Sequence, residues 1–383
     1  MKIKDTKNII IIVVLSILAG CLDFIYFYRV SNDYYLADIA PHIDAAKAVL
    51  KLEPIVLQTK RVSTVGYPLF HVLTGIFSAF LNSNYRISGA LVLTLFKISV
   101  FIVCIFMYKR LCNDNNEKKD YKVITIISIL GLSYISTLPF TGKLYLPQGS
   151  PNVWHNPTYI AMQPFALLMF YYAYKCTESK ITERSNYIGF ALTSIMTCIS
   201  KPSYIVVAIP AMCIYFLCEY IITRKICIKN ILIISLSLIP TFIILVIQYF
   251  VTFSASVSTG IRFGTFLNLS LAEALVATIS VVLYPLLYAT SVKFKFYNPK
   301  FVLLSVCSFI VGWIQYYFFY EKENADGNFA WGYFMSIFVL YFATYIDYKG
   351  NENKLKIVKY IYIVQVFWGI VYFGRLVTKH FYI

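Results

Sequence analysis

Charged residues are scarce in this sequence, and acidic residues are the scarcest. Asp, Glu, Lys and Arg make up 14% of the 383 residues, and 18 acidic residues stand against 34 basic ones. The basic residues are spread over many short segments between apolar runs. No compact basic domain exists to bind a duplex, so the charge argues against a nucleic-acid partner. A scatter of this kind is typical of the loops that orient membrane proteins.

Cysteine patterns are also uninformative. None of the nine cysteines has metal or redox spacing, and most lie in or at the ends of apolar runs, which gives no disulfide framework. The stretch Leu18–Cys21 is similar to a lipoprotein lipobox, but the apolar run continues to Tyr28 and favours an uncleaved span. We see no internal repeat, flexible linker or soluble domain, so residues 1–383 are expected to form a single transmembrane domain.

Long apolar runs are what the sequence has in abundance. Hydrophobic residues make up 59% of the chain, in runs of about 20 residues that match the ~30 Å apolar core of a bilayer. Backbone groups in lipid must be satisfied within the segment, so the runs are predicted to be helices. The prediction is an all-α, polytopic integral membrane protein with 11–12 transmembrane helices. The expected spans are 8–30, 87–108, 122–140, 158–175, 186–200, 203–222, 230–252, 270–290, 300–320, 331–347 and 358–375.

The run 66–82 is ambiguous, because it could be a further span or a half-inserted hairpin. With a cytoplasmic N-terminus and no crossing at 66–82, most basic residues fall on the inner side. Four segments are then expected on the outer face: 31–66, 140–157, 253–269 and 321–330. We therefore expect a multi-pass protein of a cell membrane, bacterial in origin, with any active site facing outside.

The long first outer loop, 31–66, holds the densest group of ionisable residues. Asp38, His42 and Asp44 lie within seven residues, and Pro41 suits the first turn of a helix. Apolar residues then recur at helical spacing, which predicts a juxtamembrane amphipathic helix over 41–51. Solvated charges on an interfacial helix are the alternative interpretation.

The second outer loop contains the string Trp154-His155-Asn156 before Pro157. These side chains could stack on a sugar ring and bind its hydroxyls, or the aromatic residues could anchor the loop at the membrane interface. Two isolated cations, Lys201 and Arg262, are suited to a phosphate, although ordinary lipid headgroups would serve them equally well.

Three ionisable residues, Asp23, Lys97 and Glu273, lie within predicted spans. Such residues are costly in a bilayer and are often functional. They are too few and too scattered to resemble a proton or ion relay.

Taken in order, the first 85 residues resemble membrane-embedded glycosyltransferases of the GT-C fold. In that family one span leads to a long outer loop with an essential acid, a juxtamembrane helix and a Tyr-Pro-Pro-Leu-Tyr-like motif. The matching features here are Asp38, the helix 41–51 and Tyr67-Pro68-Leu69-Phe70-His71, which lacks the second proline.

The resemblance implies a polyprenyl-phosphate-linked sugar as donor and a glycan or lipid-linked acceptor. Asp38 would be the general base, and His42 or His71 would help to orient the acceptor or the leaving phosphate. Lys201 and Arg262 would stabilise the phosphate, and Trp154, His155 and Asn156 would line a sugar site. Asp44, Tyr67 and His71 are further substrate-binding residues. Acidic residues of the first loop could hold a divalent cation, but their spacing is no recognised metal pattern, so no metal ligand is assigned.

Three other functions fit a chain of this kind. An oligosaccharide repeat-unit polymerase has similar spans and substrates, although it favours a larger outer loop in the second half than 253–269. A transporter or lipid flippase would have broken helices and two related halves. A non-enzymatic scaffold subunit is the third.

Overall fold

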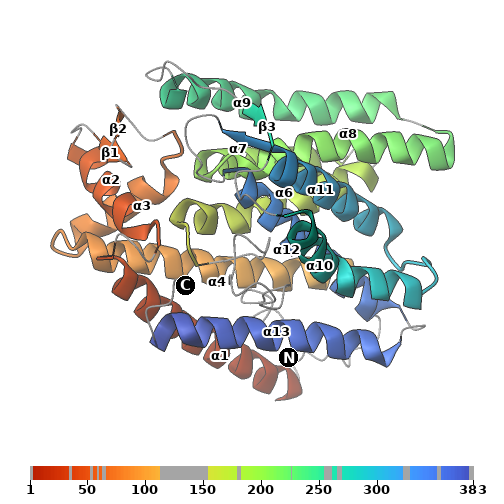
Figure 1. The fold of residues 1–383 in the computed structure, drawn as a ribbon, viewed down its shortest axis with the longest axis horizontal. Coiled ribbons are helices and arrows are strands. Elements are labelled where there is room, and N and C mark those ends of the chain that lie inside the picture. Colours follow the sequence, from red (N-terminus) through yellow and green to blue (C-terminus); the bar gives the residue numbers. More distant parts are fainter. Residues whose placement is uncertain are drawn as a thin grey trace.

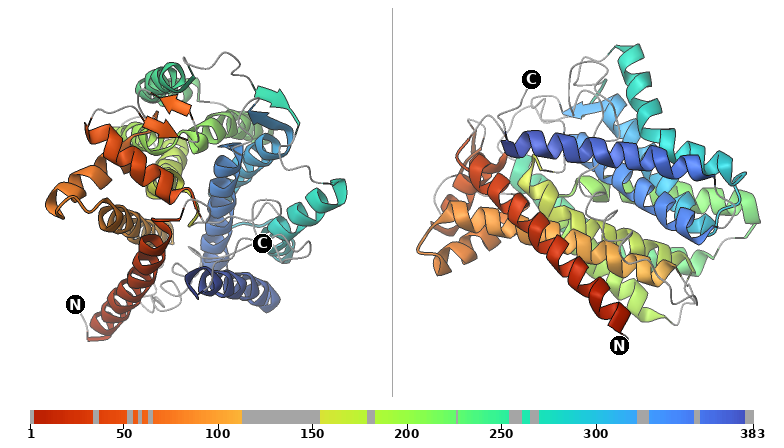
Figure 2. Two further views of the ribbon diagram at one scale, coloured as in Figure 1. Left: turned by 60° about the vertical axis from the view of Figure 1, so that its left-hand side comes forward. Right: turned by 90° about the horizontal axis from the view of Figure 1, so that it is seen from below.

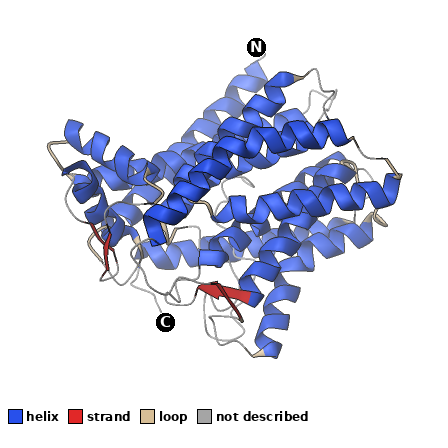
Figure 3. Cartoon of the chain, turned by 90° about the horizontal axis from the view of Figure 1, so that it is seen from above, coloured by secondary structure: helices blue, strands red, loops and turns tan. Residues whose placement is uncertain are grey.

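The computed structural model is built almost entirely of helices (Figure 3). It describes residues 3–33, 37–51, 55–57, 60–62, 66–112, 154–178, 183–225, 227–253, 261–264, 270–321, 328–351 and 355–378. The helices are α1 (Ile3–Val30), α2 (Ile39–Lys51), α3 (Leu69–Phe80), α4 (Tyr85–Leu111), α6 (Pro157–Glu178), α7 (Arg184–Ser200), α8 (Ser203–Thr223), α9 (Ile228–Phe253), α10 (Leu271–Ser291), α11 (Pro299–Phe318), α12 (Asn328–Gly350) and α13 (Lys356–Thr378).

Four short strands complete the described elements. The strands β1 (Ile55–Leu57) and β2 (Lys60–Val62) pair antiparallel, with Val56 opposite Arg61. The strands β3 (Ile261–Phe263) and β4 (Phe319–Glu321) also pair antiparallel, with Arg262 opposite Tyr320. The second pairing brings the segment after α9 to the connection between α11 and α12.

Seven of the described helices are long and apolar enough to cross a membrane: α4, α8, α9, α10, α11, α12 and α13. The chain is therefore an all-α, polytopic membrane protein. The predicted spans 8–30, 158–175 and 186–200 correspond to α1, α6 and α7, whereas 122–140 lies outside the described residues. At 66–82 the structure has α3, whose 12 residues extend only about 18 Å, too short for a full span.

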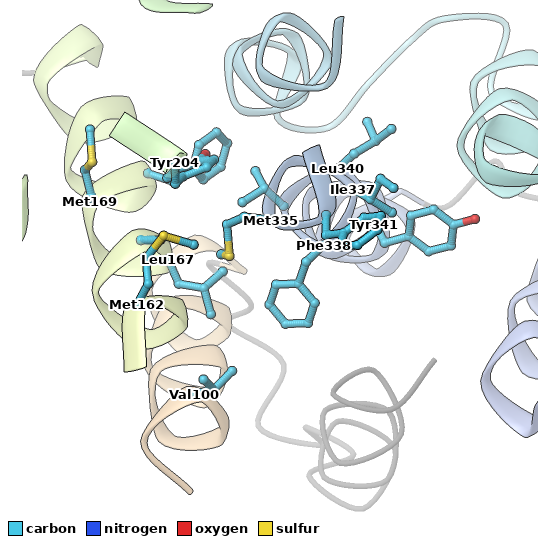
Figure 4. Close-up of a cluster of buried hydrophobic side chains, with 14 of the residues drawn as sticks. Val100, Met162, Leu167, Met169, Tyr204, Met335, Ile337, Phe338, Leu340 and Tyr341 are labelled. Carbon is cyan, nitrogen blue, oxygen red and sulfur yellow. The ribbon is translucent and has the colours of Figure 1, made fainter. Parts of the chain in front are cut away.

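Helix α12 occupies the centre of the bundle and contacts α6, α8, α10 and α11. In Figure 4, Met335 of α12 points towards Met162 and Leu167 of α6. Close approach is achieved at Gly332, where an added Cβ would lie 2.6 Å from the backbone oxygen of Ser203. Small residues at helix contacts serve this purpose in membranes, where helix association depends on close packing rather than on exclusion of water.

Helices α1 and α13 lie together on one side of the bundle, and α8 and α9 lie on the opposite side (Figure 1). Figure 2 shows α1 running beside α4, which it contacts. Arg29, in the last turn of α1, donates a 2.5 Å hydrogen bond to the carbonyl oxygen of Val377 in the last turn of α13. Arg86, at the start of α4, donates to Ser31 Oγ at 3.1 Å. These contacts fix the end of α1 from which the Asp38 loop departs.

The contacts define one end of the bundle, which we call the junction end. There α1, α7 and α13 finish, and α4, α6, α8 and α12 begin. The loops predicted to share one side of the membrane do meet at this end, because the sequence segments around Asp38, His155, Lys201 and Trp331 are in mutual contact.

Candidate functional site

Asp38 stands immediately before α2 and joins the first loop to the second. Its backbone N–H donates to the carbonyl oxygen of His155 at 3.2 Å, and its own carbonyl oxygen accepts from the N–H of His42 at 3.4 Å. Pro41 falls in the first turn of α2, where its missing N–H leaves no hydrogen bond unmade. The expected helix is therefore present, beginning two residues earlier than predicted.

The carboxylate of Asp38 receives hydrogen-bonding groups from the second loop. Asn156 Nδ2 donates to Asp38 Oδ2 at 2.8 Å, and His155 Nε2 lies 3.5 Å from Asp38 Oδ1. Partial burial favours the neutral acid, but the contacts with His155 and Asn156 prevail and hold the pKa of Asp38 below its usual value. The side chain remains 36% exposed, so an ionised carboxylate is presented at the surface of the cluster.

Asn156 is fixed by a second set of contacts. Its Oδ1 accepts from Thr158 Oγ1 at 2.7 Å and from the backbone N–H of Tyr159 at 2.9 Å. The side chain thus satisfies an N–H at the first turn of α6 while its amide nitrogen binds Asp38. The start of α6 and the position of the Asp38 carboxylate are set by one residue.

His42 of α2 and His71 of α3 form a buried pair. His42 Nδ1 lies 2.9 Å from His71 Nε2, and the two side chains are 9% and 0% exposed. Burial lowers the pKa of His42 to about 4, with the charge of Lys201 acting in the same direction against that of Asp38. Burial also lowers the pKa of His71 well below its usual value. Both rings are neutral at pH 7, so the N–H of one ring donates a hydrogen bond to the unprotonated nitrogen of the other.

Lys201 occupies a box of aromatic rings at the end of α7. Its Nζ lies 5.0 Å from the centre of the Tyr67 ring and 5.6 Å from that of Trp331, and it donates to Thr158 Oγ1 at 3.3 Å. Although the side chain is only 2% exposed, the ring faces stabilise its positive charge electrostatically. The positive charge of Lys201 disfavours protonation of His42 and so helps to keep the pKa of His42 low.

Two members of this arrangement were not identified from the sequence. Trp331, at the start of α12, stacks on His155 with ring centres 5.9 Å apart and planes 13° apart, and it also contacts Lys201. Thr158 binds both Asn156 and Lys201. A Trp at the start of a span is also typical of an interfacial aromatic belt, so the sequence carried no distinguishing signal.

The other predicted site residues lie elsewhere. The Trp154 side chain is 1% exposed and turns into the helix bundle, so its ring is not presented to a sugar. Asp44 pairs with Lys47 of its own helix at 2.6 Å and is 41% exposed. Arg262 is exposed on β3, and among the described residues no contact joins it to Asp38 or Lys201.

The structure brings six of the predicted site residues together at the junction end, and we call them the junction cluster: Asp38, His42, His71, His155, Asn156 and Lys201. It combines an accessible carboxylate, an adjacent imidazole and a buried cation, and so it could bind a hydroxyl group and an anion side by side. Within the described part of the chain, no group of three or more His, Cys, Asp or Glu residues is arranged to hold a metal ion. Comparison with protein-family models, curated proteins and solved structures finds no match to this chain.

Proposed function

We propose that the chain is a membrane glycosyltransferase of GT-C type, which moves a sugar from a polyprenyl-phosphate donor to a glycan or lipid-linked acceptor at the outer face of a cell membrane. The observation that carries this proposal is the contact of Asp38 with His155 and Asn156. It unites the acid of the first loop with polar side chains of a second loop, beside a cation, at one end of a membrane-embedded bundle.

The charge distribution suits a phosphate-linked sugar. The leaving group of such a donor becomes more negative in the transition state, and a positioned cation such as Lys201 stabilises it there. The Tyr67 ring next to that cation is only partly buried and offers a face of the kind on which sugars stack, whereas Trp331 is 3% exposed and packs against His155 and Tyr159. Asp38 stands at the hydroxyl-binding side of the same cluster.

The proposed step is a single displacement. The acceptor oxygen forms a bond to the anomeric carbon while the bond from that carbon to the phosphate oxygen breaks, and polyprenyl phosphate leaves as the anion. The acceptor's proton passes to the Asp38–His155 pair. A carboxylate with a lowered pKa is a weak proton acceptor by itself, so we assign the proton to the imidazole and its stabilisation to Asp38.

The test is a gel of surface glycans from cells that lack the chain, complemented with wild type, Asp38→Asn or Glu219→Gln. Glu219 is the matched control, because its carboxylate pairs with Lys300 at 2.9 Å outside the junction cluster. All three proteins are compared at equal abundance in the membrane. A missing sugar would shift every band, and wild type and Glu219→Gln would restore the pattern whereas Asp38→Asn would not.

Other outcomes would contradict the proposal. Restoration by Asp38→Asn would remove Asp38 from the reaction. Collapse of the glycan ladder to a single repeat unit would identify a repeat-unit polymerase instead. An unchanged ladder in cells lacking the chain would favour transport or a scaffold role.

A further inference from the structure

The indole of Trp154 is held from three sides inside the helix bundle. Its Nε1–H donates to Asp23 Oδ1 of α1 at 2.9 Å. Its ring stacks on Phe373 of α13, with centres 4.5 Å apart and planes 19° apart. Lys97 Nζ of α4 lies 5.3 Å from the indole ring centre. Trp154 belongs to a loop, yet its indole is held in place by side chains from three helices.

Two of the three residues that contact the indole are ionisable, and a protein in a bilayer retains such residues at a considerable cost in free energy. Asp23 is 8% and Lys97 2% exposed. Removing such groups from water costs several kcal/mol each, and their mutual attraction offsets this only in part. A neutral oxygen would satisfy the indole N–H as well as a carboxylate does, so burial of the indole alone does not require an ionisable pair. What Asp23 and Lys97 add is direction, since a hydrogen bond and a cation–ring contact fix the orientation of the indole plane.

That orientation bears directly on the junction cluster, because the next two residues of the chain are His155 and Asn156. Consecutive Cα atoms are ~3.8 Å apart and the backbone offers only two soft dihedrals per residue, so a displaced Trp154 displaces its neighbours. His155 lies against Asp38 and stacks on Trp331, and Asn156 binds Asp38 directly. Three successive side chains thus fasten the loop at three points.

We propose that Asp23 and Lys97 are positioning residues: through Trp154 they set the placement of His155 and Asn156 against Asp38. The consequence for sugar transfer rests on the proposed function, whereas the structural coupling does not. The pair lies away from the reacting groups, and we infer that it acts on them through the loop 154–156. Its loss is therefore expected to change turnover more than substrate affinity.

The structural coupling can be measured by fluorine NMR on the full-length protein labelled with 5-fluorotryptophan. The chain has four tryptophans, and each single Trp→Phe variant assigns one line. The Trp154 line reports the contacts of its indole with Asp23 and Lys97, and the Trp331 line reports the stacking of His155 on Trp331. Trp313 donates to Thr278 Oγ1 at 2.9 Å, away from the cluster, and serves as an internal reference.

We expect Asp23→Leu and Lys97→Met to shift or broaden both the Trp154 and the Trp331 lines and to leave the Trp313 line in place. Asp23→Asn keeps an oxygen acceptor for the indole and should return the Trp331 line towards its wild-type position. Trp154→Phe retains a ring against Phe373 but lacks the N–H donor, and should shift the Trp331 line in the same direction as Asp23→Leu. Trp154→Phe therefore still tests the proposal if Asp23→Leu does not fold.

The matched control is Asp347→Asn. Asp347 is 0% exposed and accepts a 2.5 Å hydrogen bond from Tyr288, yet it lies near the opposite end of α12. Its substitution should leave the Trp154 and Trp331 lines unmoved. If the Trp331 line stays in place in Trp154→Phe and Asp23→Leu, the positioning role is overturned.

Sugar transfer separates the two proposals. A displacement of about 1 Å costs on the order of 100-fold in rate, so kcat of Asp23→Leu should fall by about that factor, with KM for the donor changed less than about twofold. A fall in kcat/KM through KM alone would overturn the positioning role. Coupled NMR shifts together with an active Asp38→Asn would instead leave the coupling intact and refute the transferase mechanism.

Discussion

His42 Nδ1 and His71 Nε2 lie 2.9 Å apart, so two helices that are separately too short to cross a membrane are joined by an imidazole pair. A pair of this kind requires that at least one ring be neutral, and burial keeps both rings neutral at pH 7. The link between α2 and α3 therefore depends on pH, and it stands next to Asp38, on whose placement the proposed chemistry depends.

The first prediction concerns stability in acid. The pKa of His42 is about 4 in the folded protein and 6.5 in the unfolded chain. As the pH falls, the unfolded chain therefore takes up a proton on His42 before the folded protein does. This contribution is complete above pH 6.5 and is lost as the pH falls towards 4, by about 3 kcal/mol at most. Thermal unfolding in detergent between pH 7.5 and pH 4 measures it, and His42→Gln/His71→Gln should show a flatter pH dependence. Equal slopes would contradict the assignment.

The second prediction concerns packing at Gly332. A Cβ added there would lie 2.6 Å from the backbone oxygen of Ser203 and 2.7 Å from a methyl group of Val207. Because backbone cannot move aside cheaply, Gly332→Ala should lower the free energy of unfolding by about 1–3 kcal/mol. Gly374→Ala is the control, since nothing lies within 4 Å of the added atom, and helix propensity alone should stabilise it slightly. Steric trapping or denaturant titration in bilayer mimetics measures both.

Much of the fold was predictable from the sequence, because bilayer thickness and backbone hydrogen bonding leave few alternatives for an apolar run. The expected span 87–108 lies within α4, and the expected span 331–347 lies within α12. The amphipathic pattern after Pro41 predicted α2. Hydropathy could not decide whether the run 66–82 crosses the membrane. In the structure, α3 ends after 12 residues, and a turn at Asn82 and Ser83, both with positive φ, follows it.

The site was only partly predictable, for a physical reason. The charge distribution placed two loops on one side of a membrane, and Asp38, His155 and Asn156 do meet. Which way a side chain points from a loop is decided by its tertiary partners. Trp154 turned to Asp23, a residue 131 positions earlier, and no local pattern encodes that choice. Trp331 packs against His155 and Lys201 for the same reason.

The third prediction separates the two tasks of Asn156. Asn156→Asp retains an oxygen that accepts from the first turn of α6, so capping should be preserved, and any loss of stability near neutral pH comes from the charge placed beside Asp38. It also places a carboxylate where an amide now donates to Asp38, which raises the pKa of Asp38. Asn156→Ala removes both contacts and should cost about 1 kcal/mol of stability as well. Melting temperatures and transfer rates of the two variants, measured together, distinguish the roles.

The last prediction concerns Lys201 and its aromatic box. Lys201→Met keeps a long apolar stem beside Tyr67 and Trp331 but removes the charge, so the fold should persist while a phosphate-bearing donor loses its counter-charge. Because that charge also lowers the pKa of His42, the substitution should raise the pKa of folded His42 towards its unfolded value and reduce the stability that His42 costs the protein in acid. The expected result is a lower kcat for transfer together with a shallower loss of stability between pH 7.5 and pH 4. Lys201→Arg retains the charge and should keep the acid transition near its wild-type position, even where the bulkier head disturbs catalysis. A Lys201→Met protein whose acid transition and transfer rate both match wild type would show that the cation serves neither the histidine pair nor the donor.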